Sequence, residues 1–321
     1  MRTSLPRAAA AAPLVAAALA ILVGGAGTAL AGPRDVVVCY PGEAGTTKAA
    51  EPTMAELARA VERAGGLPAS SLTFTYFPDE ASCRKFIEEK KPGFAILSPD
   101  LYLELKKERP LHLLAQSEQK VPNDPKGRTA LRYHLLVKKD GPIGSLADLE
   151  GKPITTPHAS DELYAARVLL GGKLDDPRFD PAQALAAIKG VLKGDRTAVL
   201  LDDFLVESLP AVKGAKEGLR EVYVSAPVPT APVVAIGDVA PGADREAVKK
   251  GFLGLAAEPE NRKLLEMLRS TGFREPDGKA YERLEAAVSI SSEKNPTRAP
   301  ARADAESGAG PGGGEAQPSG S

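Results

Sequence analysis

Short apolar segments alternate with amphipathic segments through residues 36–116, and this alternation constrains the fold more than any other feature. Residues 36–40 form a continuous apolar run, typical of a strand buried on both faces. Residues 53–64 repeat apolar side chains with helical spacing and end at two glycines. Further strands are predicted at 72–77, 94–97 and 111–116, with helices between them. The sequence therefore predicts an α/β protein, with helices on both faces of a mostly parallel sheet.

A second series of strands and helices begins with a predicted strand at Tyr133–Lys138. Another short strand is expected at Pro153–Thr156, and the loop 157–159 leads from it into a predicted helix over 160–170. Further helices are predicted from Pro181 to Lys193 and, after the last strands, at about 243–256, 258–271 and 279–288. The first N–H groups of a helix have no partner inside the helix. A strand, a short loop and a helix start are therefore a place to hold a small polar molecule.

Two crossovers divide the predicted elements between two lobes. The polar segment 117–130 forms the first crossover, and Pro227, Pro229 and Pro232 favour an extended chain at the second. We assign residues 32–130 plus 227–292 to lobe 1 and residues 131–226 to lobe 2. Two α/β lobes joined in this way are expected to form a clamshell that closes around a ligand.

The ends of the chain differ from the rest. Residues 1–31 place Arg2 and Arg7 before an apolar run that ends in Ala29-Leu30-Ala31, the pattern of a secretory signal peptide cleaved near Ala31. An uncleaved membrane anchor is the alternative, because the apolar run is nearly long enough to span a bilayer. Residues 293–321 contain no large apolar side chain, which predicts a disordered tail.

Charge and cysteine content bear on the compartment and the partners. Removing the predicted signal takes away two of the 41 basic residues and none of the 42 acidic ones, which leaves a net charge of −3. This weak acidity argues against nucleic acid or an anionic membrane as partner. An exported protein can keep a disulfide, and Cys39 and Cys83 belong to elements expected to be neighbours. A Cys39–Cys83 disulfide and two buried free thiols both remain open.

The order of these segments resembles a known family. Residues 133–152 read Tyr-x-x-x-Val-Lys-x-Asp-Gly-x-Ile-x-Ser-Leu-x-Asp-Leu-x-Gly-Lys, followed by a short strand, a polar loop and a helix. Ser-Pro-Asp-Leu-Tyr follows the third strand, Ser-Ala-Pro-Val-Pro marks the second crossover, and Leu-x-x-Leu-x-x-x-Gly-Phe closes the series. Over about residues 34–290 the chain resembles the extracytoplasmic solute-binding proteins of ABC transporters, and most of all their phosphate/phosphonate-binding subfamily.

The resemblance implies a two-lobe periplasmic-binding-protein fold of type 2, in which each lobe is a mostly parallel sheet flanked by helices. It also implies a periplasmic protein that captures a small polar ligand between the lobes and delivers it to an ABC permease. A monomer without cofactor or metal is expected. The alternative is a solute-binding-like sensor or accessory protein with an altered pocket that acts through protein contacts.

The candidate ligand-binding residues lie at the carboxyl ends of predicted strands, where ligands of open α/β sheets bind. Tyr102 matches the tyrosine that lines the ligand cleft in the family; packing within a helix is its other reading. Asp202 is a candidate ligand residue or a helix cap. The complete set of ligand-binding candidates is Tyr40, Ser98, Tyr102, Thr156, His158, Ser160 and Asp202.

The loop after Thr156 departs from the phosphonate-binding pattern. Family members that bind phosphonates typically carry Ser-Thr-Ser-Gly there, whereas residues 158–162 read His-Ala-Ser-Asp-Glu. Asp161 and Glu162 stand in the first helical turn, where acids satisfy the positive end of the helix and repel a nearby anion. The sequence therefore leaves open whether the ligand is an oxyanion.

Catalytic patterns are weak in this sequence. It has no phosphate loop, no Gly-x-Ser-x-Gly and no metal-ligand spacing, and its three histidines, His112, His134 and His158, lie more than twenty positions apart. Ser82-Cys83-Arg84-Lys85 matches Ser-x-x-Lys only by its letters. We therefore predict a binding protein rather than an enzyme.

Overall fold

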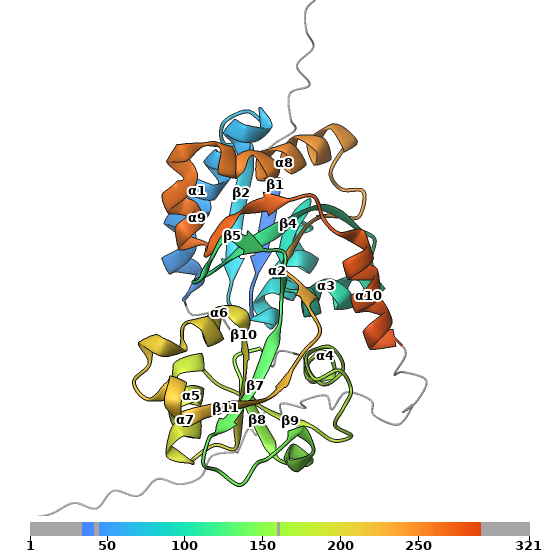
Figure 1. The fold of residues 1–321 in the computed structure, drawn as a ribbon. Coiled ribbons are helices and arrows are strands. Elements are labelled where there is room, and N and C mark those ends of the chain that lie inside the picture. Colours follow the sequence, from blue (N-terminus) through green and yellow to red (C-terminus); the bar gives the residue numbers. More distant parts are fainter. Residues whose placement is uncertain (1–33, 42–44, 159–160, 290–321) are drawn as a thin grey trace, which may run out of the picture. The chain divides into compact units, whose positions relative to one another are not determined.

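The computed structural model describes residues 34–41, 45–158 and 161–289 (Figure 1). The predicted signal peptide, residues 1–31, and the predicted tail, residues 293–321, lie outside the described residues. Within the described chain, two large β-sheets and a two-stranded ribbon are interleaved with helices. No helix in the described ranges is both long and apolar enough to cross a bilayer.

The larger sheet has seven strands, in the order β14-β4-β13-β3-β1-β2 with β5 paired to β4. β1 pairs in parallel with β2 and β3, and β13 is inserted antiparallel between β3 and β4. The strands β1 to β4 therefore run in one direction, and the returning strands run against them. The bounds are β1 (Arg34–Cys39), β2 (Leu72–Phe77), β3 (Phe94–Leu97), β4 (Leu111–Val121), β5 (Asp124–Arg128), β13 (Pro232–Ile236) and β14 (Ser270–Arg274).

Helices follow these strands as the alternation predicts. α1 (Thr47–Gly65) starts earlier than expected because the Thr46 side chain accepts a hydrogen bond from the Ala49 N–H (3.2 Å). A helix predicted over 258–271 is wrong at its end, since β14 starts at Ser270. The other helices of this part are α2 (Glu80–Lys90), α3 (Pro99–Glu108), α8 (Gly242–Gly254), α9 (Arg262–Met267) and α10 (Gly278–Ser289), with 3₁₀ turns η4 (Leu255–Ala257) and η5 (Pro259–Asn261).

The smaller sheet has five strands in the order β11-β7-β10-β8-β9. β8 pairs in parallel with β10 and β9, whereas β7 is antiparallel to β10 and β11. The first strand of this sheet therefore starts at the edge where β10 ends. The bounds are β7 (Tyr133–Lys138), β8 (Pro153–Thr156), β9 (Arg178–Pro181), β10 (Ala198–Asp202) and β11 (Leu219–Val224).

The connections in this part are shorter than the sequence predicts. The helix expected over 160–170 is a short α4 (Glu162–Tyr164) continued by a π-helical segment η2 (Ala165–Leu169). The helix expected from Pro181 starts later, because β9 occupies Arg178–Pro181. The remaining elements are η1 (Leu146–Leu149), α5 (Ala184–Lys193), α6 (Asp203–Glu207), η3 (Leu209–Ala211) and α7 (Ala215–Gly218).

The two predicted crossovers lie side by side. β6 (Ala130–Leu131) pairs antiparallel with β12 (Val228–Pro229) as a two-stranded ribbon. The prediction of a crossover over 117–130 is wrong for most of its length, because β4 runs to Val121 and β5 occupies Asp124–Arg128 in the larger sheet. The strands of the smaller sheet come from between β6 and β12. The exact lobe boundaries, 32–130 plus 227–292 and 131–226, stay a prediction.

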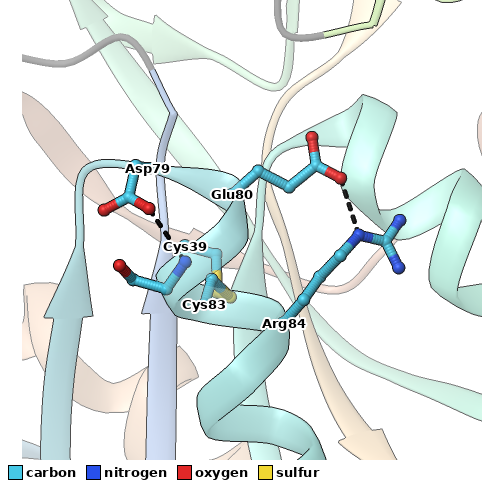
Figure 2. The surroundings of a disulfide bond; sticks show 6 residues. Cys39, Asp79, Glu80, Cys83 and Arg84 are labelled. Carbon is cyan, nitrogen blue, oxygen red and sulfur yellow. Dashed lines mark hydrogen bonds and ion pairs between the residues drawn. A yellow bond between two sulfur atoms is a disulfide. The ribbon is translucent and has the colours of Figure 1, made fainter. Parts of the chain in front are cut away.

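A disulfide fixes the end of β1. Cys39 on β1 and Cys83 on α2 are joined, with their Cα atoms 6.0 Å apart (Figure 2). Asp79 caps α2 by accepting a hydrogen bond from the Ser82 N–H (2.8 Å). Both cysteines are fully buried in the hydrophobic core. The cross-link therefore holds the residue that precedes Tyr40 at a defined place.

Candidate functional site

A cavity of about 160 Å³ lies where strands of both sheets end. Tyr40 follows β1, Ser98 follows β3, His158 follows β8, and Asp202 ends β10. These four predicted ligand residues are brought together around the cavity. The other lining residues are Pro41, Pro99, Asp100, Gln119, Leu131, Tyr133, Pro157, Tyr164, Gln183, Ala184, Leu205, Val228, Pro229, Thr230, Ala231 and Arg269.

Ser98 presents a hydroxyl that the fold does not use. Its backbone N–H donates to the carbonyl of Cys39 (3.1 Å), and its own carbonyl accepts from the Tyr102 N–H (2.9 Å). Although Ser98 holds the N-cap position of α3, its side chain makes no capping hydrogen bond. The side chain is buried, and among the described residues its Oγ has no hydrogen-bond partner. An unpaired buried hydroxyl is costly, so a ligand atom is its natural partner.

The loop after β8 aims His158 at the cavity. The fully buried Thr156 accepts the His158 N–H on its Oγ1 (3.1 Å), so this hydroxyl stabilises the loop rather than lining the cavity. The His158 ring meets the Tyr133 ring edge-on, with centroids 5.2 Å apart. Its Nε2 lies 3.6 Å from Asp202 Oδ2, beyond hydrogen-bonding distance. Ser160, the next predicted ligand residue, lies outside the described residues.

Aspartates occupy the helix starts around the cavity. Asp161 Oδ1 accepts the N–H groups of Leu163 (2.8 Å) and Tyr164 (3.1 Å) at the start of α4. Asp202 Oδ1 accepts the Leu205 N–H (2.9 Å) at the start of α6. The N–H groups that an oxyanion would seek at these two helix starts are thus already bound to carboxylates.

A third acid stands in the first turn of α3, where Asp100 is buried and lines the cavity. The fixed charges among the described lining residues are therefore two carboxylates, of Asp100 and Asp202, and one guanidinium, of Arg269. The Arg269 guanidinium carbon lies 4.9 Å from the centre of the Phe204 ring. With neutral histidine, the lining carries a net charge of −1.

Three tyrosines line the cavity, and the sequence drew attention to only one of them. Tyr133 pairs in register with Asp202, because β7 is antiparallel to β10. The sequence analysis missed Tyr133 as a lining residue. Its position as the first residue of the strand after the crossover could have indicated it, because that strand begins at the edge of the sheet where ligands bind. Tyr164 is buried, and its Oη has no hydrogen-bond partner within the described chain.

The pKa values of these phenols reflect their burial and the carboxylates around them. Burial raises the pKa of Tyr133 well above its ordinary value, and the nearby Asp202 raises it further. Burial likewise raises the pKa of Tyr164, with smaller contributions from Tyr133 and Asp100. Both hydroxyls therefore stay protonated at neutral pH and can donate or accept a hydrogen bond.

Tyr102 lies away from the lining. It is fully buried, its Oη lies 3.4 Å from Glu285 Oε1 on α10, and its ring packs edge-on against Tyr281 at 5.3 Å. Helix packing, the other reading that the sequence allowed, describes this geometry. A contact between Tyr102 and a ligand stays a prediction.

A saturated polar cluster adjoins the cavity. Asp203 Oδ2 accepts the Arg132 N–H (2.8 Å), and Asp203 Oδ1 lies 2.9 Å from His134 Nε2. Arg128 pairs with Asp203 (3.2 Å) and with Glu207 (3.0 Å). Burial opposes the charge of Asp203, but these hydrogen bonds and the Arg128 charge outweigh it and lower the pKa of Asp203. The cluster ties α6 to β5 and to the start of β7.

Another group of charged side chains places three carboxylates around the guanidinium of Arg84. Arg84 on α2 pairs with Glu80 (2.6 Å), Glu104 and Glu108 (2.9 Å). Burial raises the pKa of Glu104 to about 7, and Glu80 and Asp161 add repulsion that Arg84 only partly offsets. Glu104 on α3 thus feels the charge of the aspartate that starts α4. Among the described residues, no group of three metal-ligating side chains forms a metal site.

Two α/β sheets contribute residues from their strand ends to one cavity, and the two crossovers between them lie side by side. This arrangement is that of a two-lobe solute-binding protein. The family model for the ABC transporter phosphonate periplasmic substrate-binding protein matches residues 44–281. The chain therefore belongs to this family of solute-binding proteins, which serve ABC transporters in the periplasm. No curated protein sequence matches it significantly.

Solved structures support the fold. A Xanthomonas citri protein bound to ATP is 17% identical, with a TM-score of 0.62, and the alignment covers 81% of this chain and 98% of that chain. A binding protein component of an ABC phosphonate transporter from Pseudomonas aeruginosa is 14% identical, with a TM-score of 0.59, covering 80% and 86%. PhnD1 from Prochlorococcus marinus, in complex with methylphosphonate, is 13% identical, with a TM-score of 0.58, covering 82% and 98%. All three share the two-lobe fold predicted from the sequence.

Proposed function

We propose that the cavity beside Tyr40, Ser98, His158 and Asp202 is the ligand site of this solute-binding protein. The observation that carries the proposal is the pair of buried, unpartnered hydroxyls, Ser98 Oγ and Tyr164 Oη, in one cavity within the described chain. A bound solute would satisfy both. Thr156 would act by positioning His158, and Ser160 is expected to contribute from the same loop.

The solute's polar group is proposed to be an amine or a hydroxyl rather than a phosphonate. Asp161 and Asp202 already accept the N–H groups at the starts of α4 and α6, and Asp100 adds a second carboxylate to the lining. Tyrosine rings and carboxylates attract cations, whereas two carboxylates repel an anion. The relatives solved with methylphosphonate and with ATP hold anions, so this chain would differ from them in ligand class.

Ligand capture is proposed to proceed by closure of the two lobes. Residues from both sheets line the cavity, so the solute would gain its full set of contacts only in the closed state. That differential affinity shifts the population toward closure. The closed, loaded protein would present its solute to an ABC permease as a monomer, after export and cleavage near Ala31, without chemical turnover.

A second candidate function rests on the same capped helix starts. If Asp161 and Asp202 block anion binding and the cavity takes no other solute, the protein would act as a sensor or accessory partner through protein contacts. Unliganded protein that no small solute stabilises would favour this reading.

The test is a thermal-shift and calorimetric screen of wild-type protein against ethanolamine, choline, glycerol, methylphosphonate and inorganic phosphate. Asp202→Asn is the informative variant, because the amide oxygen keeps the cap on α6 while the charge is lost. Asp161→Asn is the matched control, since it makes the same change at a helix start outside the lining. We expect amines to bind wild type and Asp161→Asn, and to bind Asp202→Asn at least tenfold more weakly. Tight binding of methylphosphonate or phosphate would contradict the proposed ligand class.

A further inference from the structure

A second cavity, of about 410 Å³, lies under the first turns of α1 and adjoins the polar cavity. Four residues, Tyr40, Gln119, Ala231 and Arg269, line both cavities. The two cavities therefore adjoin. The rest of the second lining is mainly apolar and includes Val38, Met54, Leu57, Ile96, Met267 and Phe273.

The sequence of α1 explains why space remains there. The first turns of the helix line the cavity with the small side chains of Ala49, Ala50 and Thr53, and its buried residues begin only at Met54. Ala49 and Met267 in the lining are exposed, so this hollow beside the ligand site is open to an occupant from solvent. Its volume falls within the range of about 300–1,000 Å³ that small-molecule pockets occupy.

A polar atom inside the second cavity also lacks a partner. Ser117 is 9% exposed, and its Oγ makes no hydrogen bond to any described residue. Its backbone is fully engaged: the N–H donates to the Ala231 carbonyl (3.0 Å), and the carbonyl accepts from Thr230 Oγ1 (2.5 Å). A mainly apolar cavity with one such hydroxyl is the usual composition of a ligand pocket.

The polar cavity alone is small. Its volume of about 160 Å³ lies below the range of about 300–1,000 Å³ that small-molecule pockets occupy. This is room for a charged or hydroxyl-bearing head but little more. We propose that the second cavity holds the hydrocarbon part of the solute whose head occupies the polar cavity, so that the solute is a small amphiphile.

This inference rests on the proposed function, and the experiment separates the two. Titration calorimetry of wild-type protein would use two homologous series, the n-alkylamines and the n-alkylphosphonates from methyl to hexyl. In the series whose methyl member binds, we expect Kd to fall about fourfold with each added CH₂, equivalent to about 0.8 kcal/mol. Ala50→Leu fills the second cavity and should cut this gain below twofold per CH₂ without weakening the methyl member.

Ala55→Leu is the matched control, because Ala55 is exposed on the same helix and lies outside the lining. It should leave the gain per CH₂ unchanged. If Ala50→Leu fails to fold, Ala50→Val makes the same test with a smaller side chain. Kd values that do not depend on chain length, with the methyl member still bound, would overturn this inference and leave the proposed function standing.

If neither series binds, native mass spectrometry of solute that copurifies decides the matter. A copurified amphiphile supports the inference, and a solute without hydrocarbon overturns it. Protein that is empty and binds no tested solute contradicts the proposed function itself, and the inference with it.

Discussion

Asp202 and Asp203 are neighbours in the chain but stand in opposite surroundings. Asp203 faces a saturated cluster in which Arg132, His134 and Arg128 all bind its carboxylate. Asp202 uses one oxygen to cap α6 and turns the other toward a cavity with two unpartnered hydroxyls. A buried polar side chain therefore does not by itself indicate a binding site. A buried polar group without a hydrogen-bond partner does indicate one, because native structures pair nearly all of their buried polar groups.

The largest effect on stability is expected for the polar cluster around Asp203. Asp203→Asn replaces a carboxylate that three donors approach with an amide that can accept only on its oxygen. We expect it to lower the free energy of unfolding by about 3 kcal/mol, measured by urea denaturation at pH 7. The stability that Asp203 contributes should also fade as pH falls through its lowered pKa. A loss below 1 kcal/mol would mean that the cluster is not the structural counterpart of the cavity.

The carboxylates around Arg84 form an intermediate case, since they share one cation. Because the folded pKa of Glu104 is about 7 and its ordinary value is 4.5, the folded state binds the proton more tightly than the unfolded state. Stability should therefore decline as pH rises from about 4.5 to 7, by about 1–3 kcal/mol, and level off above that. Glu104→Gln should flatten this decline. A profile that Glu104→Gln leaves unchanged would assign the decline to other groups.

The same substitution, tyrosine to phenylalanine, can be made at two buried tyrosines that differ in hydrogen bonding. Tyr281 Oη donates to the carbonyl of Thr230 (2.7 Å), whereas Tyr164 Oη has no partner in the described chain. Tyr281→Phe should lower stability by about 1–2 kcal/mol, because it orphans a buried carbonyl. Tyr164→Phe should change the stability of unliganded protein by less than about 0.5 kcal/mol and weaken solute binding several-fold. Equal losses from both variants would remove the distinction.

The smallest effect on stability is expected at Asp202. Asp202→Asn keeps an oxygen for the Leu205 N–H, so the free energy of unfolding should change by no more than about 0.5 kcal/mol. The informative contrast is with Asp203→Asn, measured by the same denaturation. A stability loss at Asp202 as large as that at Asp203 would make it a structural residue and would remove it from the binding site.

The sequence predicts the elements of this fold better than its pairings. Strand and helix alternation, strand ends and the second crossover follow from local patterns at residues such as Tyr40, Ser98 and His158. The first crossover does not, because β4 and β5 occupy most of the predicted segment 117–130. The insertion of β13 between β3 and β4 and the strand β14 depend on long-range pairing that no local pattern carries. The contribution of Tyr133 to the cavity has the same origin, since only the register with Asp202 brings it there.

The sequence also does not predict which polar side chains find hydrogen-bond partners. Ser98, Asp161 and Asp202 are all residue types that cap helices, yet the Ser98 hydroxyl does not cap α3. Asp161, predicted in the first helical turn, is instead the cap of α4, and Asp202 caps α6. Which caps are occupied depends on backbone geometry over distances of a few tenths of an ångström. The second cavity depends on how α1 packs against the sheet, which no single segment of the sequence specifies.

The most direct test of the central claim is native mass spectrometry of the mature protein, purified without refolding and analysed beside Asp202→Asn. We predict that each wild-type chain binds one small molecule, which fragmentation identifies as an amine or hydroxyl compound with a hydrocarbon portion. We also predict that Asp202→Asn does not retain this molecule. A bound phosphonate or phosphate, retained by Asp202→Asn, would contradict the account.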